Sequence, residues 1–91
     1  MNDEPDIERL LNAGWTLSPD GSALTRSFRF RDFAQAFGWM TRVALQAEKM
    51  NHHPEWLNIY RDVHVTLKTH ETGTITHRDV ALAEIMDREA G

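Results

Sequence analysis

The feature that most constrains this fold is a helical repeat of apolar side chains that begins just after residue 32. Spacings of three and four residues are typical of a helix that buries one stripe, and they relate Phe33, Ala36, Phe37, Met40, Val43, Ala44 and Ala47. Asp32 is a suitable N-cap for this helix, and Asn51 is acceptable at a helix C-terminus. Because Pro54 disfavours helical geometry at His53, we expect one long amphipathic helix that ends near residue 51.

Segments on both sides of this helix have the composition and alternation of strands with one buried face. Residues 15–17 and 24–31 precede it, and the turn Ser18-Pro19-Asp20-Gly21 separates them, because proline presets φ and glycine accepts a positive φ. Residues 56–60 and 63–70 follow it. In the last segment one face carries Val63, Val65 and Leu67, and the other carries His64, Thr66, Lys68 and His70.

Two shorter helices complete the order of elements. Pro5 to Asn12 predicts the first helix, which stops at Gly14, and Thr76 opens the last one. The order is therefore α-β-β-α-β-β-α. Consecutive strand pairs and segregated helices predict an α+β fold, a four-stranded antiparallel sheet with helices packed on one face. No linker or low-complexity run interrupts the sequence, so residues 1–91 are expected to form a single domain.

Size and composition narrow the classes of protein that fit these 91 residues. A chain of this length buries only roughly 60–65% of its unfolded surface, so oligomerisation is a common remedy. With no cysteine, disulfides and thiolate metal sites are excluded. The formal net charge of −4 argues against nucleic-acid binding. The acidic start is not a secretory signal, and no apolar run approaches the roughly 20 residues that cross a bilayer, so we expect a cytoplasmic protein without a membrane partner.

Histidines are concentrated in one part of the sequence, where four of the five lie between His52 and His70. Histidine suits proton transfer in both directions, because its unperturbed pKa is the one nearest neutrality. His52 and His53 leave the long helix, His70 ends the fourth strand, and Asp79 lies in the first turn of the last helix. Side chains at the ends of elements often carry function. These four residues are candidate catalytic groups, with Glu48 close to them in the sequence.

Each candidate also has an explanation in ordinary structure. His64 and His77 fit solvated surface positions, and Glu48 fits the exposed last turn of its helix. Thr76-x-x-Asp79 fits a capping box, in which the carboxylate accepts an exposed backbone N–H. Capping is the simpler role for Asp79, although capping and catalysis are compatible.

A metal site is the main alternative to acid–base chemistry. His52, His53, His70 and a carboxylate resemble a zinc or iron ligand set. However, His64 and His70 are separated by about 20 Å if one strand joins them, and adjacent histidines tend to point apart. The spacings HxH, HxxxH and HExxH do not occur. The sequence therefore disfavours a metal.

Three aromatic side chains allow two interpretations: Trp39, Trp56 and Tyr60. Core packing is their commoner use, although a flat heterocycle would also stack on such rings.

The segment Glu48-Lys49-Met50-Asn51-His52-His53-Pro54-Glu55-Trp56 closely resembles the pterin-4a-carbinolamine dehydratases. Residues 37–47 resemble the family's long helix, and further matches follow in the family's order and spacing: Tyr60, residues 63–67, residues 69–71 and Arg78-Asp79. The resemblance covers about residues 14–85. A histidine pair alone is weak evidence, whereas this whole constellation is specific. Asn51 stands where members often have aspartate, which tempers any argument from charge at that position.

The resemblance implies a fold, an assembly and a reaction. The fold is a four-stranded antiparallel sheet with helices on one face, in agreement with the order derived above, and the assembly is a homodimer or homotetramer. The reaction is the dehydration of 4a-hydroxytetrahydrobiopterin to the quinonoid dihydropterin. This hydro-lyase step recycles tetrahydrobiopterin and implies a functional link to an aromatic amino-acid hydroxylase. Neither a metal nor a tightly bound cofactor is implied.

The resemblance also implies roles for individual residues. His52 and His70 act as acid and base on opposite faces of the pterin, and His53 binds and orients the ring. Asp79 orients an imidazole or stabilises its charge, and Glu48 is a weaker electrostatic contributor to substrate binding. Further substrate contacts are expected in two stretches: Asn51-His52-His53 and Lys68-Thr69-His70-Glu71.

Two other functions stay open at this level. Some family members act as dimerisation cofactors of a transcription regulator, so a protein-interaction module is one alternative. A dehydratase-fold protein that acts on a pterin related to the molybdenum cofactor is the other.

Overall fold

The elements follow one another in the predicted order. The computed structural model describes residues 4–91, so residues 1–3 of the acidic start lie outside the described residues. It contains α1 (Glu8–Ala13), β1 (Thr16–Leu17), β2 (Leu24–Arg29), α2 (Phe33–Lys49), β3 (Glu55–Ile59), β4 (Asp62–Leu67) and α3 (His77–Ala90). The predicted α+β class and the order α-β-β-α-β-β-α are therefore confirmed.

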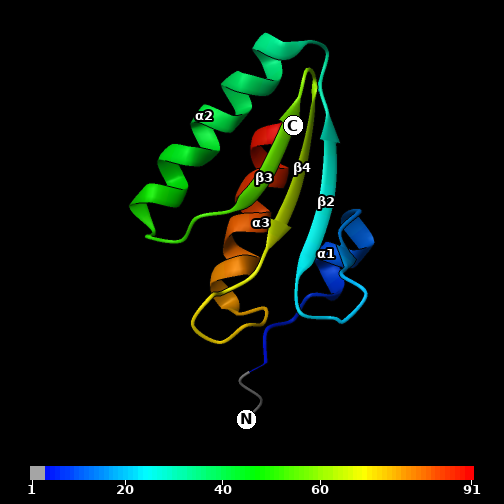
Figure 1. The fold of residues 1–91 in the computed structure, drawn as a ribbon, viewed down its shortest axis with the longest axis vertical. Helices are drawn as coiled ribbons and strands as arrows, with labels where there is room; N and C mark the ends of the chain where they lie inside the picture. The colour runs from blue at the N-terminus through cyan, green and yellow to red at the C-terminus, as the bar shows by residue number, and fades with distance from the viewer. Residues whose placement is uncertain (1–3) are drawn as a thin grey trace.

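The four strands form one antiparallel sheet in the order β1-β2-β4-β3. β4 lies between β2 and β3, so His64 pairs with Ser27 on one side and with Leu57 on the other. Because both are antiparallel to β4, β2 and β3 are parallel to each other, and α2 makes the crossover between them as in a split βαβ unit. The helices α2 and α3 pack against each other beside the sheet (Figure 1).

One face of the sheet and the facing helix stripes form a common core. Its buried apolar side chains are Leu10, Trp15, Leu24, Phe28, Ala36, Trp39, Val43, Ala47, Val63, Val65, Leu67, Leu82, Ala83 and Met86. The indole N–H of Trp39 donates to the carbonyl of Met86 at 3.1 Å, so this buried polar group is satisfied. The opposite face of the sheet is polar and exposed at Ser27 and His64. The predicted packing of helices on one face is therefore confirmed.

Three predicted boundaries differ by a few residues. The first helix begins at Glu8 and not at Pro5, because the Asp6 carboxylate accepts the Glu8 N–H at 3.1 Å and holds the preceding residues in a local turn. β2 ends at Arg29, and the residues after it lead into α2. The Phe30 N–H donates to the Arg61 carbonyl in the β3–β4 turn at 2.9 Å. β4 ends at Leu67, beyond which the backbone forms only an isolated bridge.

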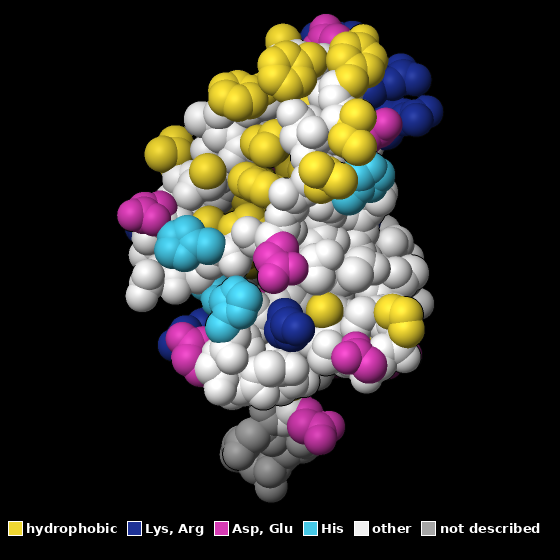
Figure 2. Space-filling model, viewed as in Figure 1, with side chains coloured by type: hydrophobic (Ala, Val, Ile, Leu, Met, Phe, Trp, Pro, Cys, Tyr) yellow, Lys and Arg dark blue, Asp and Glu magenta, His cyan; other side chains and the backbone are white. Residues whose placement is uncertain are grey.

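The apolar stripe of α2 is wider than the stripe it buries. Ala36, Trp39, Val43 and Ala47 face the core, whereas other apolar side chains of α2 and of the β3 region stay exposed. We call these the α2–β3 apolar surface: Phe33, Phe37, Leu45, Leu57, Ile59 and Tyr60. Figure 2 shows apolar side chains gathered at the end of the molecule where α2 begins and β3 turns into β4. None of the described helices is both long and apolar enough to cross a membrane.

Candidate active site

The C-terminus of α2 fixes the backbone that carries the histidine pair. Asn51 has a φ of 53°, in the left-handed region. Its N–H donates to the Glu48 carbonyl at 3.2 Å, and the next N–H, that of His52, donates to the Ala47 carbonyl at 3.0 Å. These two bonds form a Schellman motif, which satisfies helix carbonyls that would otherwise lack a partner. The position of His52 is therefore determined by how α2 ends.

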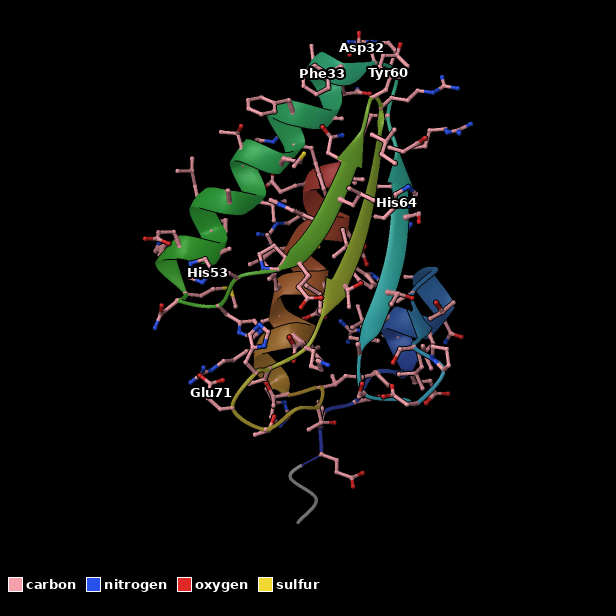
Figure 3. The ribbon with its side chains drawn as sticks, in the orientation of Figure 1. Asp32, Phe33, His53, Tyr60, His64 and Glu71 are labelled. Atoms are coloured by element: carbon pink, nitrogen blue, oxygen red, sulfur yellow. The ribbon has the colours of Figure 1, made fainter. Side chains whose placement is uncertain are left out.

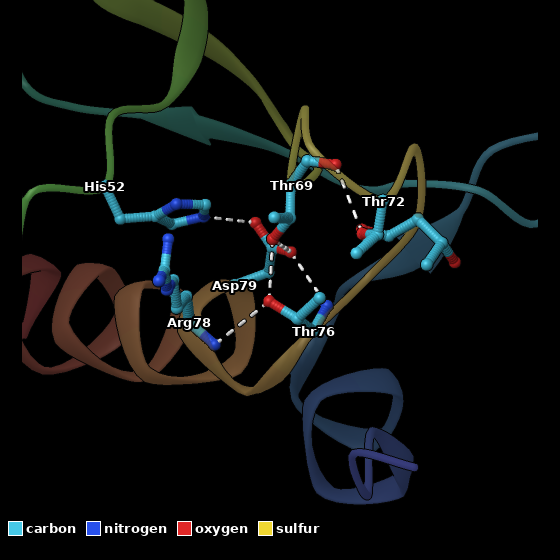
Figure 4. A network of polar contacts seen from close by, with 7 residues as sticks. His52, Thr69, Thr72, Thr76, Arg78 and Asp79 are labelled. Carbon is cyan, nitrogen blue, oxygen red and sulfur yellow. Dashed lines mark hydrogen bonds and ion pairs between the residues drawn. The ribbon is translucent and has the colours of Figure 1, made fainter.

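The N-terminus of α3 brings a carboxylate to this histidine. Thr76 and Asp79 form the predicted capping box, and the same Asp79 side chain also reaches His52, whose Nε2 lies 2.6 Å from Oδ1 (Figure 4). Asp79 is 0% exposed and His52 is 7% exposed. Capping and contact with the imidazole are thus simultaneous properties of one carboxylate, because its two oxygens serve different partners.

The second oxygen of Asp79 accepts two further hydrogen bonds. Oδ2 receives the Thr69 hydroxyl at 2.8 Å and the Thr76 N–H at 2.9 Å. A buried carboxylate is costly unless hydrogen bonds compensate for lost hydration, and here three donors surround it. The three hydrogen bonds fix the orientation of the Asp79 carboxylate.

This arrangement selects one tautomer of His52. Since the Asp79 carboxylate only accepts, Nε2 of the imidazole must carry the hydrogen. Nδ1 then remains as the nitrogen that can take up or release a proton. The geometry is that of an imidazole with a carboxylate behind it, which stabilises the imidazolium when Nδ1 becomes protonated.

His53 points away from this pair and has its own carboxylate. Its Nε2 lies 2.8 Å from Glu48 Oε1, and both side chains are exposed, by 58% and 79%. An exposed pair of this kind contributes only about 0–1 kcal/mol to stability. Its effect is therefore on the direction of the imidazole rather than on the fold.

A pocket of about 290 Å³ joins these groups, and its lining comes from the α2–β3 connection, the loop after β4 and the start of α3: Asn51, His52, His53, Pro54, His70, Glu71 and Arg78. That volume is near the lower end of the range for small-molecule sites. His70 is exposed in the β4–α3 loop and makes no side-chain hydrogen bond to a described residue. Figure 3 shows that His53 and Glu71 lie at the same end of the molecule, where α2 ends and this loop passes.

Five of the predicted site residues thus line one pocket, namely Asn51, His52, His53, His70 and Glu71. Asp79 contacts His52 and Glu48 contacts His53, and Thr69 is buried, with its hydroxyl on Asp79. Lys68 does not line this pocket, and its charge acts on Asp20 in the β1–β2 turn. Arg78 was not among the predicted site residues, although it precedes Asp79 directly; its side chain lies beside the His52 ring (Figure 4).

His64 and the three aromatic residues with two interpretations lie outside the histidine pocket. His64 is exposed on the open face of the sheet, with Nδ1 2.7 Å from the Ser27 hydroxyl, and Figure 3 shows it far from His53. Trp39 is in the core and Trp56 packs against it. Tyr60 is exposed in the β3–β4 turn. None of these side chains lines the histidine pocket.

Among residues 4–91 no group of three His, Asp or Glu side chains is placed to hold a metal ion. The hydrogen bonds of His52 and His53 go to the carboxylates of Asp79 and Glu48.

A family model and curated relatives that share one name match this chain. The family model described as pterin 4 alpha carbinolamine dehydratase matches residues 2–89. A relative from Rhodospirillum rubrum is 47% identical over 91 residues, covering 98% of this chain and 95% of its own. One from Mesorhizobium japonicum is 54% identical over 77 residues, covering 85% and 79%. Both carry the name pterin-4-alpha-carbinolamine dehydratase provisionally.

Two solved structures have the same fold. The crystal structure of a transcriptional coactivator/pterin dehydratase from Brucella melitensis superposes with a TM-score of 0.88 at 45% identity, covering 99% of this chain and 100% of the other. A pterin dehydratase-like protein identified as a RuBisCO assembly factor in the alpha-carboxysome has a TM-score of 0.74 at 23% identity, covering 86% and 90%. The second likeness concerns the fold alone. With the family model matched over residues 2–89 and relatives near 50% identity, the chain belongs to the pterin 4 alpha carbinolamine dehydratase family.

Proposed function

We propose that this protein is a 4a-hydroxytetrahydrobiopterin dehydratase, a hydro-lyase that converts the pterin 4a-carbinolamine to the quinonoid dihydropterin. The observation that carries the proposal is the buried Asp79–His52 pair at the wall of a pocket that also receives His53 and His70. The family membership supplies the substrate class, and the pocket supplies three imidazoles in different surroundings.

The reaction needs two proton movements. The hydroxyl on C4a leaves as water once its oxygen is protonated, and the neighbouring ring N–H loses its proton as the C=N bond forms. The net change is the loss of one water molecule, with no oxidation or reduction. Positioned general acids and bases each contribute typically 10²–10⁴ in rate, and imidazole serves both roles near neutral pH.

We assign the base to His52 and the acid to His70. Asp79 occupies Nε2 of His52, so Nδ1 is the ring nitrogen left to accept a proton. His70 is exposed and makes no side-chain hydrogen bond to a described residue, so it can turn toward the leaving oxygen and exchange its proton with solvent. His53 and Arg78, which also line the pocket, would bind and orient the pterin.

The test is direct. Native protein added to freshly generated 4a-hydroxytetrahydrobiopterin should accelerate the loss of water over the spontaneous rate, followed by absorbance. The same assay with a pterin that carries a molybdenum-cofactor-type side chain distinguishes the recycling function from action on another pterin. Acceleration with that second substrate alone would reject the recycling function.

We further propose that the protein is a homo-oligomer, a dimer or a tetramer, that uses the α2–β3 apolar surface. Leu45 and Leu57 are 66% and 58% exposed there, and β3 is an edge strand of the described sheet. Contiguous exposed apolar side chains beside a free strand edge are typical of interaction sites. The same surface favours the second candidate function, a protein-interaction role, because the Brucella melitensis relative is described as a transcriptional coactivator as well as a pterin dehydratase.

A further inference from the structure

Thr69 does not line the histidine pocket, yet its side chain contacts Asp79 at the centre of the proposed site. It is 4% exposed at the end of the sheet, and its hydroxyl donates to Asp79 Oδ2 at 2.8 Å. The Thr76 hydroxyl lies 2.6 Å from the Thr69 hydroxyl. Since the Thr69 hydrogen is used on Asp79, the hydrogen of this second bond must come from Thr76.

The hydrogen bonds therefore form one chain with a single direction. Thr76 Oγ1 donates to Thr69 Oγ1, Thr69 Oγ1 donates to Asp79 Oδ2, and Asp79 Oδ1 accepts from His52 Nε2 (Figure 4). Chains of this kind polarise one another and are stronger than isolated bonds. Among the described residues, Oδ2 has two donors, the Thr69 hydroxyl and the Thr76 backbone N–H, so Thr69 is its one side-chain donor.

The backbone of Thr69 is held as firmly as its side chain. Its N–H donates to the Thr74 carbonyl at 3.0 Å, and its own carbonyl accepts the Gly73 N–H at 2.8 Å. These bonds close the loop in which His70 is the next residue. Thr69 thus connects both imidazoles: it reaches His52 through Asp79, and it precedes His70 in the chain.

We infer that Thr69 is a positioning residue for the dehydration, which fixes the Asp79 carboxylate and through it the Nε2–H tautomer of His52. The inference rests on the proposed function for its consequence in rate. The tautomer itself is a property of the free protein and can be measured without substrate.

Thr69→Val keeps the shape of the side chain and removes its hydrogen-bond donor. Oδ2 would then keep only the Thr76 N–H, and a buried carboxylate with one donor fewer is under-solvated. The carboxylate is free to rotate toward other donors, so Oδ1 no longer points at Nε2 alone. Without that acceptor, the imidazole populates both tautomers, and Nδ1 carries hydrogen in part of the molecules, where it cannot act as a base.

The experiment compares native protein, Thr69→Val and Thr69→Ser, with Thr72→Val as the matched control. Thr72 is exposed in the same loop, and among the described residues its hydroxyl contacts only the backbone carbonyls of Thr69 and Thr74, at 3.4 and 3.5 Å. Nitrogen-15 NMR of the imidazoles, with the His52 signals identified from their absence in His52→Gln, reports which ring nitrogen carries hydrogen. Dehydration kinetics on the same four proteins give kcat and KM.

We expect native protein, Thr69→Ser and Thr72→Val to show the Nε2–H tautomer and similar rates. Thr69→Val should show mixed tautomers and a kcat lower by about tenfold or more, with KM nearly unchanged, since outer partners of metal-bound histidines cost roughly 10–100-fold when removed. If Thr69→Val instead retains the native tautomer, or if Thr69→Ser behaves like Thr69→Val, the inference is wrong and Thr69 is only structural.

The two claims can fail separately. Native protein that does not accelerate dehydration rejects the proposed function, while a tautomer that still depends on the Thr69 hydroxyl upholds the positioning of His52.

Discussion

The Nε2 atom of His52 lies 2.6 Å from Oδ1 of Asp79, and the two residues are brought together by the end of one helix and the start of another. The Schellman motif of α2 places the histidine, and the capping box of α3 places the carboxylate. The pair therefore depends on helix-terminal hydrogen bonds that also stabilise the fold. A site built in this way is rigid where the proton must be transferred, which is what acid–base catalysis requires.

Replacing Asp79 by Asn should reduce rate and stability together. The amide cannot accept at both oxygens, so a donor would face either His52 Nε2 or the Thr69 and Thr76 donors on the other side. We expect a loss of about 1–3 kcal/mol in the free energy of unfolding and a dehydration rate lower by roughly 10²-fold or more. Urea unfolding and the carbinolamine assay measure these two effects. A native rate in the folded variant would show that the carboxylate serves only as a cap.

Asn51 should tolerate glycine but not valine. Its φ of 53° suits glycine and asparagine, whereas the left-handed region costs other residues about 1–2 kcal/mol. Asn51→Val should therefore lower the free energy of unfolding by that amount and slow dehydration by displacing His52, while Asn51→Gly keeps the free energy of unfolding near its native value. The control is Asn12→Val in α1, an exposed helical position where only a few tenths of a kcal/mol are expected. Equal effects at the two asparagines would argue against conformational strain at position 51.

Charges placed on the α2–β3 apolar surface should separate the subunits. The double variant Phe37→Glu, Leu45→Glu puts two carboxylates where exposed apolar side chains now lie, and repulsion between copies would oppose assembly. Sedimentation velocity should show an oligomer for native protein and a monomer for the variant. Gln46→Glu, exposed elsewhere on α2, is the control and should assemble normally. A native protein that sediments as a monomer would remove the assembly proposal.

The β1–β2 turn should lose part of its stability in acid. The pKa of Asp20 is lowered from 3.8 to about 2, first by the backbone N–H of Ser22 and then by the hydroxyls of Ser22 and Ser18. Because the folded pKa is below the unfolded one, these bonds stabilise the fold fully above about pH 4, and their contribution is lost as the pH falls toward 2.

Urea unfolding of native protein and Asp20→Ala at several pH values measures this effect. The difference between them should be constant near neutrality and should shrink below pH 4. Glu55→Ala, which removes an exposed carboxylate without a side-chain hydrogen bond to any described residue, is the control. A difference that does not change with pH would mean that the charge of Asp20 is not what stabilises the turn.

Much of the fold could be predicted from the sequence because its determinants are local. The helical repeat of α2, the Asp32 cap and the Thr76–Asp79 box act within a few residues, and all three are present. The sheet order β1-β2-β4-β3 could not be predicted, because strand pairing is decided by packing between distant segments. The early start expected for α1 was wrong because a side-chain bond from Asp6 competes with the helix.

The site was predicted less completely, for related reasons. The histidines at the element ends were identified by residue type, and the pocket brings His52, His53 and His70 together. The family resemblance implied that Asp79 orients an imidazole, but not which one, because the Asp79–His52 contact spans 27 positions. The Thr69 bond to Asp79 was not predicted, because it depends on where β4 ends. The exposure of Phe37 also departs from simple burial of an apolar stripe, since a stripe can face a partner as well as a core.

The most direct measurement is the dehydration rate of freshly generated 4a-hydroxytetrahydrobiopterin with native protein and with the double variant His52→Ala, His70→Ala. Circular dichroism first establishes that the variant is folded, which is expected because neither side chain belongs to the apolar core. The account predicts strong acceleration by native protein and a rate near the spontaneous one with the variant. A folded variant that accelerates the reaction as well as native protein would contradict the assignment of catalysis to these histidines.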